Sequence, residues 1–89
     1  MIVRIPTSLR KHVGGASKVE IDAATVADGL HGLTDKHAEL RDQLFTSDAA
    51  VVPYINVFVN DQNIRDLQGL DTPVTDRDEV LLVPALAGG

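Results

Sequence analysis

Apolar and polar residues alternate in two short segments at the beginning of the chain. Residues 1–6 and 18–22 each place every second side chain on one face, the pattern of a half-buried strand. In the second segment Val19 and Ile21 point inward, and the charged residues around them point to solvent. A glycine pair at 14–15 marks a turn. The pattern therefore predicts an N-terminal hairpin.

A helical period follows this hairpin. Thr25 suits the N-cap of a helix, and Asp28 occupies the position of a shortened capping box. One stripe of the predicted helix holds Val26, Leu30, Leu33 and His37. Gly29 and Gly32 lie inside the helix, where each costs about 0.5–1 kcal/mol relative to alanine. Close packing of the helix on a sheet would explain them.

The middle of the chain combines a second helical stretch with the clearest strand. Residues 38–45 favour a short helix that presents Leu40 and Leu44, and 46–53 are expected to form a loop. Residues 54–59 alternate strictly. Their two faces carry Ile55, Val57 and Val59 on one side and Tyr54, Asn56 and Phe58 on the other.

Turn signals divide the last third into short strands. Asn60-Asp61 suits a tight hairpin turn, after which residues 64–67 are expected to form a short return strand. A turn-rich link over 70–75 leads to a last strand at 79–83. One helix can cover one face of such a sheet. We therefore predict an α+β fold of the β-grasp type, with a mixed four- to five-stranded sheet and one main helix.

Length and composition fit one small folded domain. The chain has 89 residues, of which 44% are hydrophobic and 24% are charged. We expect a domain over residues 1–84 and a flexible tail over 85–89. The absence of cysteine excludes disulfides, thiolate zinc sites, iron–sulfur clusters and a cysteine nucleophile.

The net charge narrows the classes of partner, and the apolar segments near the two ends of the chain bear on where the protein is expected. A net charge of -5 without a Lys/Arg cluster argues against nucleic acid and anionic membranes. The net negative charge favours partners with basic protein surfaces, or it serves solubility alone. The first residues lack the apolar stretch of a signal peptide, and the apolar run Val80–Ala87 is too short to span a bilayer. We expect a cytoplasmic protein made without a removed leader.

The titratable residues do not predict a metal site or an active site. His31 and His37 are six positions apart on the predicted helix, hence on different faces, and His12 falls in a predicted loop. The acidic run of Asp76, Asp78 and Glu79 is interpreted as a solvated turn that faces a basic partner. No nucleophile signature or phosphate-binding glycine loop is present.

Several motifs resemble the ThiS/MoaD family of sulfur carriers, which are ubiquitin-like proteins, and in particular its CysO branch. The matching segments are Ile5-Pro6-Thr7, Leu9-Arg10, His12, Gly14-Gly15, Asn56-Val57-Phe58-Val59-Asn60-Asp61, Asp76-Arg77-Asp78 and Pro84-Ala85-Leu86-Ala87-Gly88-Gly89. Arg77 departs from the family, which more often has glycine there. If that turn needed a positive φ, arginine would cost on the order of 1 kcal/mol.

The resemblance implies a carrier rather than an enzyme, with the C-terminal carboxylate of Gly89 as its working group. An E1-like adenylating enzyme of the MoeB/ThiF type would use ATP to form an acyl-adenylate, which sulfur then converts to a thiocarboxylate. Gly88 and the small residues Ala85 and Ala87 suit a tail that threads a partner's active site. Leu86 is the one bulky tail residue and is expected to anchor there.

A second expected feature is an apolar patch on the uncovered face of the sheet. Glu79 shares parity with Leu81 and Val83, so these two should be exposed, joined by Phe58 and Ile2. Exposed apolar patches mark binding sites. The resemblance implies that this region docks the adenylating enzyme and the sulfur acceptors.

The final sulfur acceptor is left open by the sequence. The CysO-like case implies a PLP-dependent cysteine synthase and a zinc metallopeptidase that releases the cysteine; PLP and zinc belong to those partners, and this chain binds no cofactor. Molybdopterin, thiamin or a thiosugar are alternative acceptors. A ubiquitin-like protein modifier and a non-catalytic β-grasp binding module are alternatives of other classes.

Overall fold

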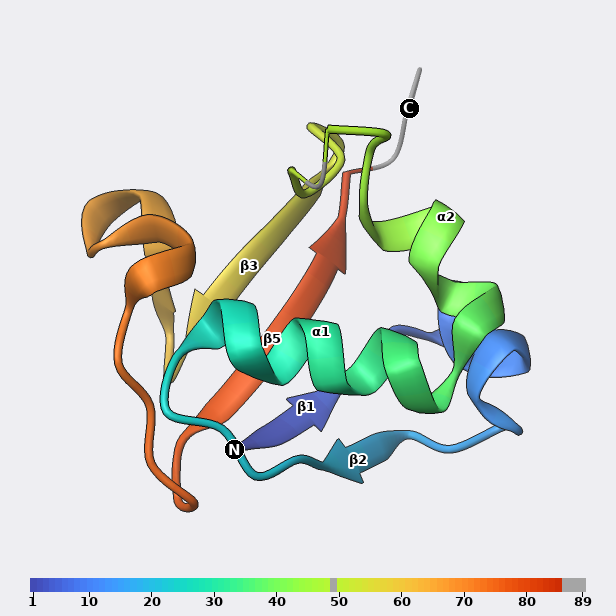
Figure 1. The fold of residues 1–89 in the computed structure, drawn as a ribbon, viewed down its shortest axis with the longest axis horizontal. Coiled ribbons are helices and arrows are strands. Elements are labelled where there is room, and N and C mark those ends of the chain that lie inside the picture. The colour runs from blue at the N-terminus through green and yellow to red at the C-terminus, as the bar shows by residue number, and fades with distance from the viewer. Residues whose placement is uncertain (49, 86–89) are drawn as a thin grey trace.

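The computed structural model describes residues 1–48 and 50–85, which form a five-stranded sheet crossed by one helix (Figure 1). The strands are β1 (Ile2–Arg4), β2 (Lys18–Glu20), β3 (Ile55–Val59), β4 (Gln62–Asn63) and β5 (Glu79–Pro84). The α-helices are α1 (Val26–Lys36) and α2 (Arg41–Leu44), and the 3₁₀ helices are η1 (Thr7–Val13), η2 (Ala38–Leu40), η3 (Ile64–Asp66) and η4 (Gly69–Asp71).

The sheet has the mixed topology that the sequence predicted. Its strand order is β2-β1-β5-β3-β4. The central pair β1–β5 is parallel, and the other three pairs are antiparallel. The first and last strands of the chain therefore lie side by side in the middle of the sheet, which confirms the α+β, β-grasp prediction.

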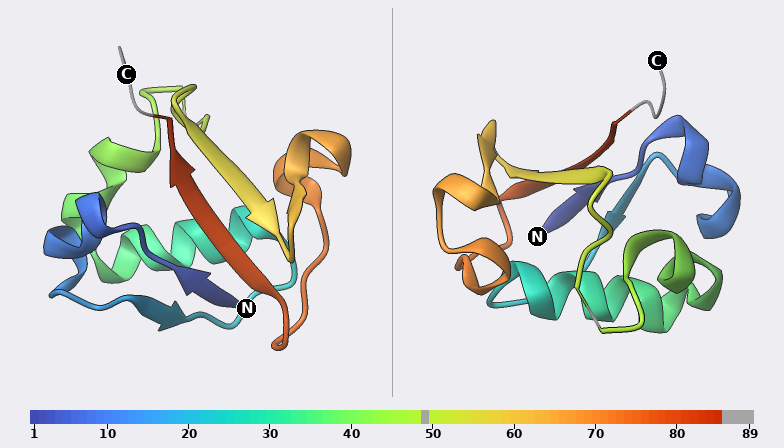
Figure 2. Two further views of the ribbon diagram at one scale, coloured as in Figure 1. Left: turned by 180° about the vertical axis from the view of Figure 1, so that it is seen from behind. Right: turned by 90° about the horizontal axis from the view of Figure 1, so that it is seen from above.

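Helix α1 covers one face of the sheet, and the core lies between them (Figure 2). Thr25 caps α1 as predicted, since its side chain accepts a hydrogen bond of 3.2 Å from the Asp28 N–H. The stripe on α1 is buried, with Val26, Leu30 and Leu33 each 0% exposed. From the sheet, the inward residues of the strands complete this core: Val3, Ile55, Val57, Val59, Val80 and Leu82.

The two glycines of α1 mark its close approach to the sheet. A Cβ on Gly29 would collide with the side chain of Met1, which is itself buried. A Cβ on Gly32 would lie 3.0 Å from Cγ2 of Ile21. Met1 and Ile21 are cross-strand partners that exchange hydrogen bonds of 2.7 and 2.9 Å. The expectation that close packing explains these glycines is therefore confirmed.

The second helical stretch also takes its predicted place. Residues 38–44 form η2 and α2, one residue short of the predicted stretch, and Leu40 and Leu44 are fully buried. None of the helices formed by residues 1–48 and 50–85 combines the length and the apolar character that crossing a bilayer requires.

The predicted return strand at 64–67 is wrong. Asn60 and Asp61 both have positive φ, 47° and 81°, the geometry of a two-residue hairpin turn. This turn brings the chain back at once, so β4 is Gln62–Asn63. The Asn63 side chain then accepts a hydrogen bond of 2.9 Å from the Arg65 N–H, which caps η3 and ends the strand.

The connection between the first two strands is also not the simple turn that the glycine pair suggested. The two strands pair antiparallel as predicted. Between them, η1 packs Leu9 and Val13 into the core before Gly14 ends it in the left-handed conformation. His12, expected in a loop, lies in this 3₁₀ helix, with its Nδ1 3.8 Å from Oε2 of Glu39.

Candidate functional site

The face of the sheet that α1 leaves uncovered carries one row of side chains across all five strands. In the left view of Figure 2 this face is turned toward the viewer, and α1 lies behind the sheet. The strand registers align Lys18, Arg4, Leu81, Phe58 and Asn63 in that order. The row changes from charged residues on β2 and β1 to apolar residues on β5 and β3. The open face therefore has a charged half and an apolar half.

The apolar half contains three of the four predicted surface residues. Phe58 is the cross-strand partner of Leu81, and both are half-buried. Val83 lies one step further along β5, opposite Asn56, and is 40% exposed. Phe58, Leu81 and Val83 thus form one continuous patch, which is called the open-face patch below. All three lie on the uncovered face, but only Val83 has the exposure that the sequence predicted, because Phe58 and Leu81 are half-buried.

Ile2 is on the same face but in different surroundings. Its cross-strand partners are Glu20 on β2 and Glu79 on β5. Oε1 of Glu79 also pairs with Nε of Arg4 at 2.7 Å, and both side chains are largely exposed. Ile2 therefore lies in the charged half, separated from the open-face patch by an ion pair that solvent screens.

The end of β5 is held against the start of β3. Pro84 is the register partner of Ile55, and the N–H of Ala85 donates a hydrogen bond of 2.6 Å to the carbonyl oxygen of Tyr54. Ala85, the first residue of the expected tail, is therefore still tied to the sheet. The other tail residues, Leu86, Ala87, Gly88 and Gly89, lie outside the described residues.

Tyr54 stands beside this junction and was not among the predicted site residues. Its side chain is 49% exposed, more than that of Val83. Tyr54 precedes β3 and lies in the turn that the hydrogen bond of 3.1 Å from the Ile55 N–H to the Val52 carbonyl oxygen closes, whereas the sequence predicted it in the strand with Asn56 and Phe58. The sequence could not show that Tyr54 adjoins the tail, because that depends on the pairing of β3 with β5.

The opposite end of β5 is tied to the Asn60 turn by polar side chains. Nδ2 of Asn60 donates to Oδ1 of Asp78 at 2.7 Å, and the N–H of Thr75 donates to Oδ2 of Asp78 at 2.8 Å. The N–H of Glu79 donates to Oδ1 of Asn60 at 3.0 Å. The hydrogen bond from Asn60, followed by that from Thr75, lowers the pKa of Asp78 below its ordinary value of 3.8. Asp78 thus has a structural role.

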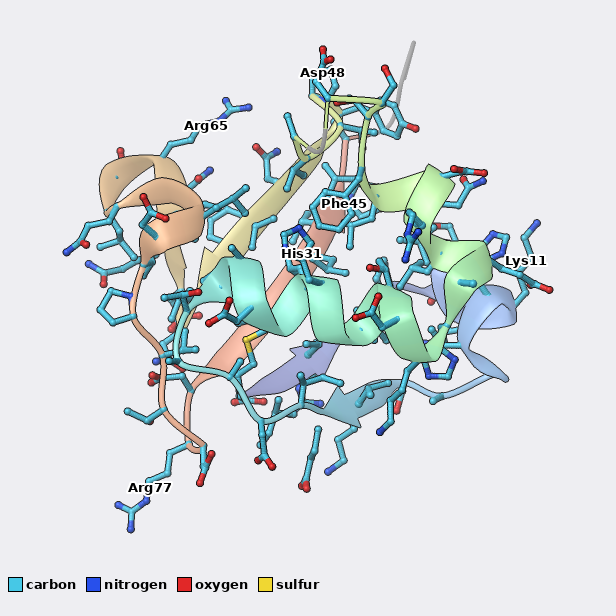
Figure 3. All side chains as sticks on the ribbon, viewed as in Figure 1. Lys11, His31, Phe45, Asp48, Arg65 and Arg77 are labelled. Atoms are coloured by element: carbon cyan, nitrogen blue, oxygen red, sulfur yellow. The ribbon has the colours of Figure 1, made fainter. Side chains whose placement is uncertain are left out.

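Arg77 carries no backbone penalty in this turn. Within residues 1–48 and 50–85, the only non-glycine residues with positive φ are Asn60 and Asp61. The conditional cost of arginine at this position therefore does not arise. Figure 3 shows the Arg77 side chain pointing away from the fold at the turn before β5.

The three histidines do not form a cluster, since His12 belongs to η1, His31 to α1 and His37 to the C-terminal end of α1. The ring of His31 lies 5.1 Å from that of Phe45, centre to centre, on the outer side of α1 (Figure 3). His37 ends α1 as its C-cap residue. Across the part of the chain that the structure describes, no three His, Cys, Asp or Glu side chains are grouped to hold a metal ion.

The comparison with a family model and the comparison with curated proteins give the same family. The ThiS family model matches residues 3–89. The sulfur carrier protein CysO of Mycobacterium tuberculosis is 34% identical over 89 residues, which covers 98% of this chain and 96% of that protein. These relatives are small carriers rather than catalysts.

Solved structures of similar proteins extend this finding. The Amycolatopsis orientalis BexX/CysO complex contains a chain that is 39% identical with a TM-score of 0.89, covering 99% of this chain and 98% of its own. The small archaeal modifier protein 1 of Methanosarcina acetivorans is 31% identical with a TM-score of 0.87, covering 99% of this chain and 94% of its own.

Proposed function

Since the chain belongs to the ThiS family, we propose that it is a sulfur carrier whose working group is the C-terminal carboxylate of Gly89. The observation that carries this proposal is the extent of the family match, which runs through the sheet and includes Gly88 and Gly89. The similarity to a sulfur carrier protein over 98% of the chain supports it.

Activation of the carboxylate comes first in the proposed chemistry. A terminal carboxyl has a pKa of about 3.3–3.7, so at neutral pH it is an anion and a poor electrophile. An E1-like adenylating enzyme of the MoeB/ThiF type overcomes this with ATP. A carboxylate oxygen attacks the α-phosphorus, pyrophosphate leaves, and an acyl-adenylate forms at Gly89.

Sulfur transfer follows. Hydrosulfide attacks the carbonyl carbon of the adenylate, AMP leaves, and a thiocarboxylate remains. Where a persulfide is the donor, a thiol must then cleave the resulting acyl disulfide. The product is a nucleophilic sulfur bound to a protein that a synthase can recognise.

The open face supplies the proposed recognition surface. Phe58, Leu81 and Val83 form an apolar patch on the two strands that lead to the tail. Exposed apolar patches of this kind serve protein–protein contacts. We place the adenylating enzyme and the sulfur acceptors on this patch, with Ile2 at its charged border and the tail residues 85–89 entering the partner's active site.

Cysteine biosynthesis is the favoured pathway. In it, the thiocarboxylate sulfur forms a bond to the β-carbon of an activated serine on a PLP-dependent cysteine synthase, and the group that activates the serine oxygen leaves with that oxygen. A zinc metallopeptidase then uses water to hydrolyse the bond that joins the new cysteine to Gly89. The similarity to the sulfur carrier protein CysO supports this choice. The same carrier chemistry would also serve molybdopterin, thiamin or a thiosugar.

Protein modification is a second candidate function. The similarity to a small archaeal modifier protein favours it. In that case the adenylated Gly89 forms an isopeptide bond with a target lysine, and AMP leaves. Digested cell extracts would contain lysine side chains that carry the terminal residues of this chain.

Carrier-dependent ATP–pyrophosphate exchange tests the shared first step. The cognate adenylating enzyme, incubated with ATP and labelled pyrophosphate, should exchange the label only when the chain is present. Deletion of Gly89 should abolish the exchange, whereas Leu67→Ala, on the surface of η3's end, should not affect it. Exchange that persists without Gly89 would remove the basis of the proposal.

A further inference from the structure

The carbonyl oxygen of Tyr54 accepts a hydrogen bond from Ala85 at the end of β5, and we infer that Tyr54 is a positioning residue for the transfer of Gly89 into the partner's active site. This inference rests on the proposed carrier function. It concerns a residue that neither the sequence motifs nor the open-face patch includes.

The register of the sheet fixes the place of Tyr54. β3 and β5 pair from Val59–Val80 to Ile55–Pro84, and the hydrogen bond from Ala85 to Tyr54 extends this ladder by one more residue. The backbone of Tyr54 therefore lies beside Ala85, the last described residue before Leu86.

The exposed fractions of the large hydrophobic residues also draw attention to Tyr54 at the end of β5. Among the described residues, three large hydrophobic side chains are exposed: Tyr54 at 49%, Val83 at 40% and Leu67 at 36%. Tyr54 comes two residues before Asn56, the partner of Val83, and its carbonyl oxygen accepts from Ala85, two residues after Val83. Two of the three therefore belong to the same end of the β3–β5 pair. Leu67, at the end of η3, is remote from it in sequence and in the sheet order.

The short reach of the tail makes this neighbourhood a necessary contact. Beyond Ala85 there are four residues, Leu86 to Gly89. Fully extended, four residues span at most about 13–14 Å. A partner that acts on the carboxylate of Gly89 must therefore bring its surface to the end of β5, and it meets the Tyr54 ring there.

The chemistry of the surroundings specifies the kind of contact. Tyr54, Asn56, Val83, Pro84 and Ala85 carry no formal charge, in contrast to Arg4 and Glu79 on the other half of the face. A tyrosine offers an apolar ring with little conformational entropy to lose and a hydroxyl that can stay in water. The structure thus assigns to the mouth of the partner's active site an apolar or aromatic rim that covers the ring of Tyr54.

A kinetic comparison tests this role. Tyr54→Ala, Tyr54→Phe and the matched control Leu67→Ala are assayed as substrates of the cognate adenylating enzyme in pyrophosphate exchange. Truncation of an interface aromatic should raise KM about tenfold for Tyr54→Ala. Tyr54→Phe keeps the ring and should stay within about twofold of the wild type, as should Leu67→Ala. Thermal unfolding of each variant shows whether the fold is retained.

Fluorine NMR tests the same contact without changing the fold. The chain has one tyrosine and two phenylalanines, so 3-fluorotyrosine gives one signal, and 4-fluorophenylalanine gives one each for Phe45 and Phe58. Addition of the unlabelled adenylating enzyme should shift the Tyr54 and Phe58 signals. The Phe45 signal, from a buried ring beside His31, should change only by the broadening common to the whole complex.

The outcomes separate this inference from the carrier function. An unchanged Tyr54 signal at saturating enzyme, or a KM for Tyr54→Ala equal to that of Leu67→Ala, overturns the positioning role while the wild type is still adenylated. A wild-type chain that is not adenylated at all overturns the proposed function itself.

Discussion

Leu81 and Leu82 are neighbours in β5, yet one lies on the open face of the sheet and the other beneath α1. Leu82 is 3% exposed within the core, whereas Leu81 is half-buried beside Phe58. The same alternation thus supplies both the interior and the proposed docking surface. The comparison teaches that parity alone decides whether an apolar residue of β5 joins the core or the open face.

Truncation of the two leucines should produce the largest contrast. Leu82→Ala leaves a cavity in the core and should lower the free energy of unfolding by about 2–5 kcal/mol. Leu81→Ala removes partly hydrated atoms and should cost about 1 kcal/mol or less. Urea unfolding monitored by circular dichroism measures both, and equal losses would contradict the assignment of faces.

A charge on the open-face patch should separate recognition from stability. Phe58→Asp should weaken binding to the adenylating enzyme by about 2 kcal/mol or more, because it places a carboxylate in the apolar contact. The matched variant Val57→Asp, on the covered face, should unfold the protein. Isothermal titration calorimetry together with thermal unfolding measures the two effects. If Phe58→Asp also unfolds the chain, the face assignment is wrong.

Adding one methyl group at the helix–sheet contact tests the covered face more finely. Gly29→Ala should destabilise the fold by a net amount of up to about 2 kcal/mol, because displacing the buried side chain of Met1 costs about 1–3 kcal/mol. This cost opposes the gain in helix propensity of about 0.8–1.0 kcal/mol from replacing glycine. Alanine at Gly32, next to Ile21, should be better tolerated. The order of the two midpoints in urea distinguishes the sites.

The smallest effect is expected at the polar end of β5. The pKa of Asp78 is lower in the folded chain than its ordinary 3.8, so its ionised form contributes stability above that value. This contribution is lost as the pH falls through the folded pKa. Asp78→Asn should therefore be less stable than the wild type near neutral pH, and the difference should shrink under acidic conditions. A constant difference in unfolding midpoint across this range would contradict the role of Asp78.

Most of the fold followed from local patterns. The faces of β2, β3 and α1 were predictable because their periods of two and 3.6 residues record which side is buried. The Thr25 cap and the Asn60-Asp61 turn were predictable because those residue types suit the required geometry. The strand predicted at 64–67 failed because a two-residue turn, and not the apolar character of Ile64 and Leu67, sets where β4 begins and ends.

The site was predictable in part. Parity alone placed Phe58, Leu81 and Val83 on the same face, and the pairing of β3 with β5 makes them neighbours. The isolation of Ile2 between two glutamates comes from the pairing of β1 with β2 and β5, and the place of Tyr54 comes from the pairing of β3 with β5. Such pairings join segments that are distant along the chain, and no local pattern records them.

The intact mass of the chain after reaction with the adenylating enzyme, ATP and sulfide tests the central claim most directly. The account predicts that one terminal oxygen is exchanged for sulfur in the wild type, and that a chain without Gly89, or with an amidated Gly89, keeps its original mass. A wild-type chain that gains no sulfur, or a blocked chain that gains as much, would contradict it.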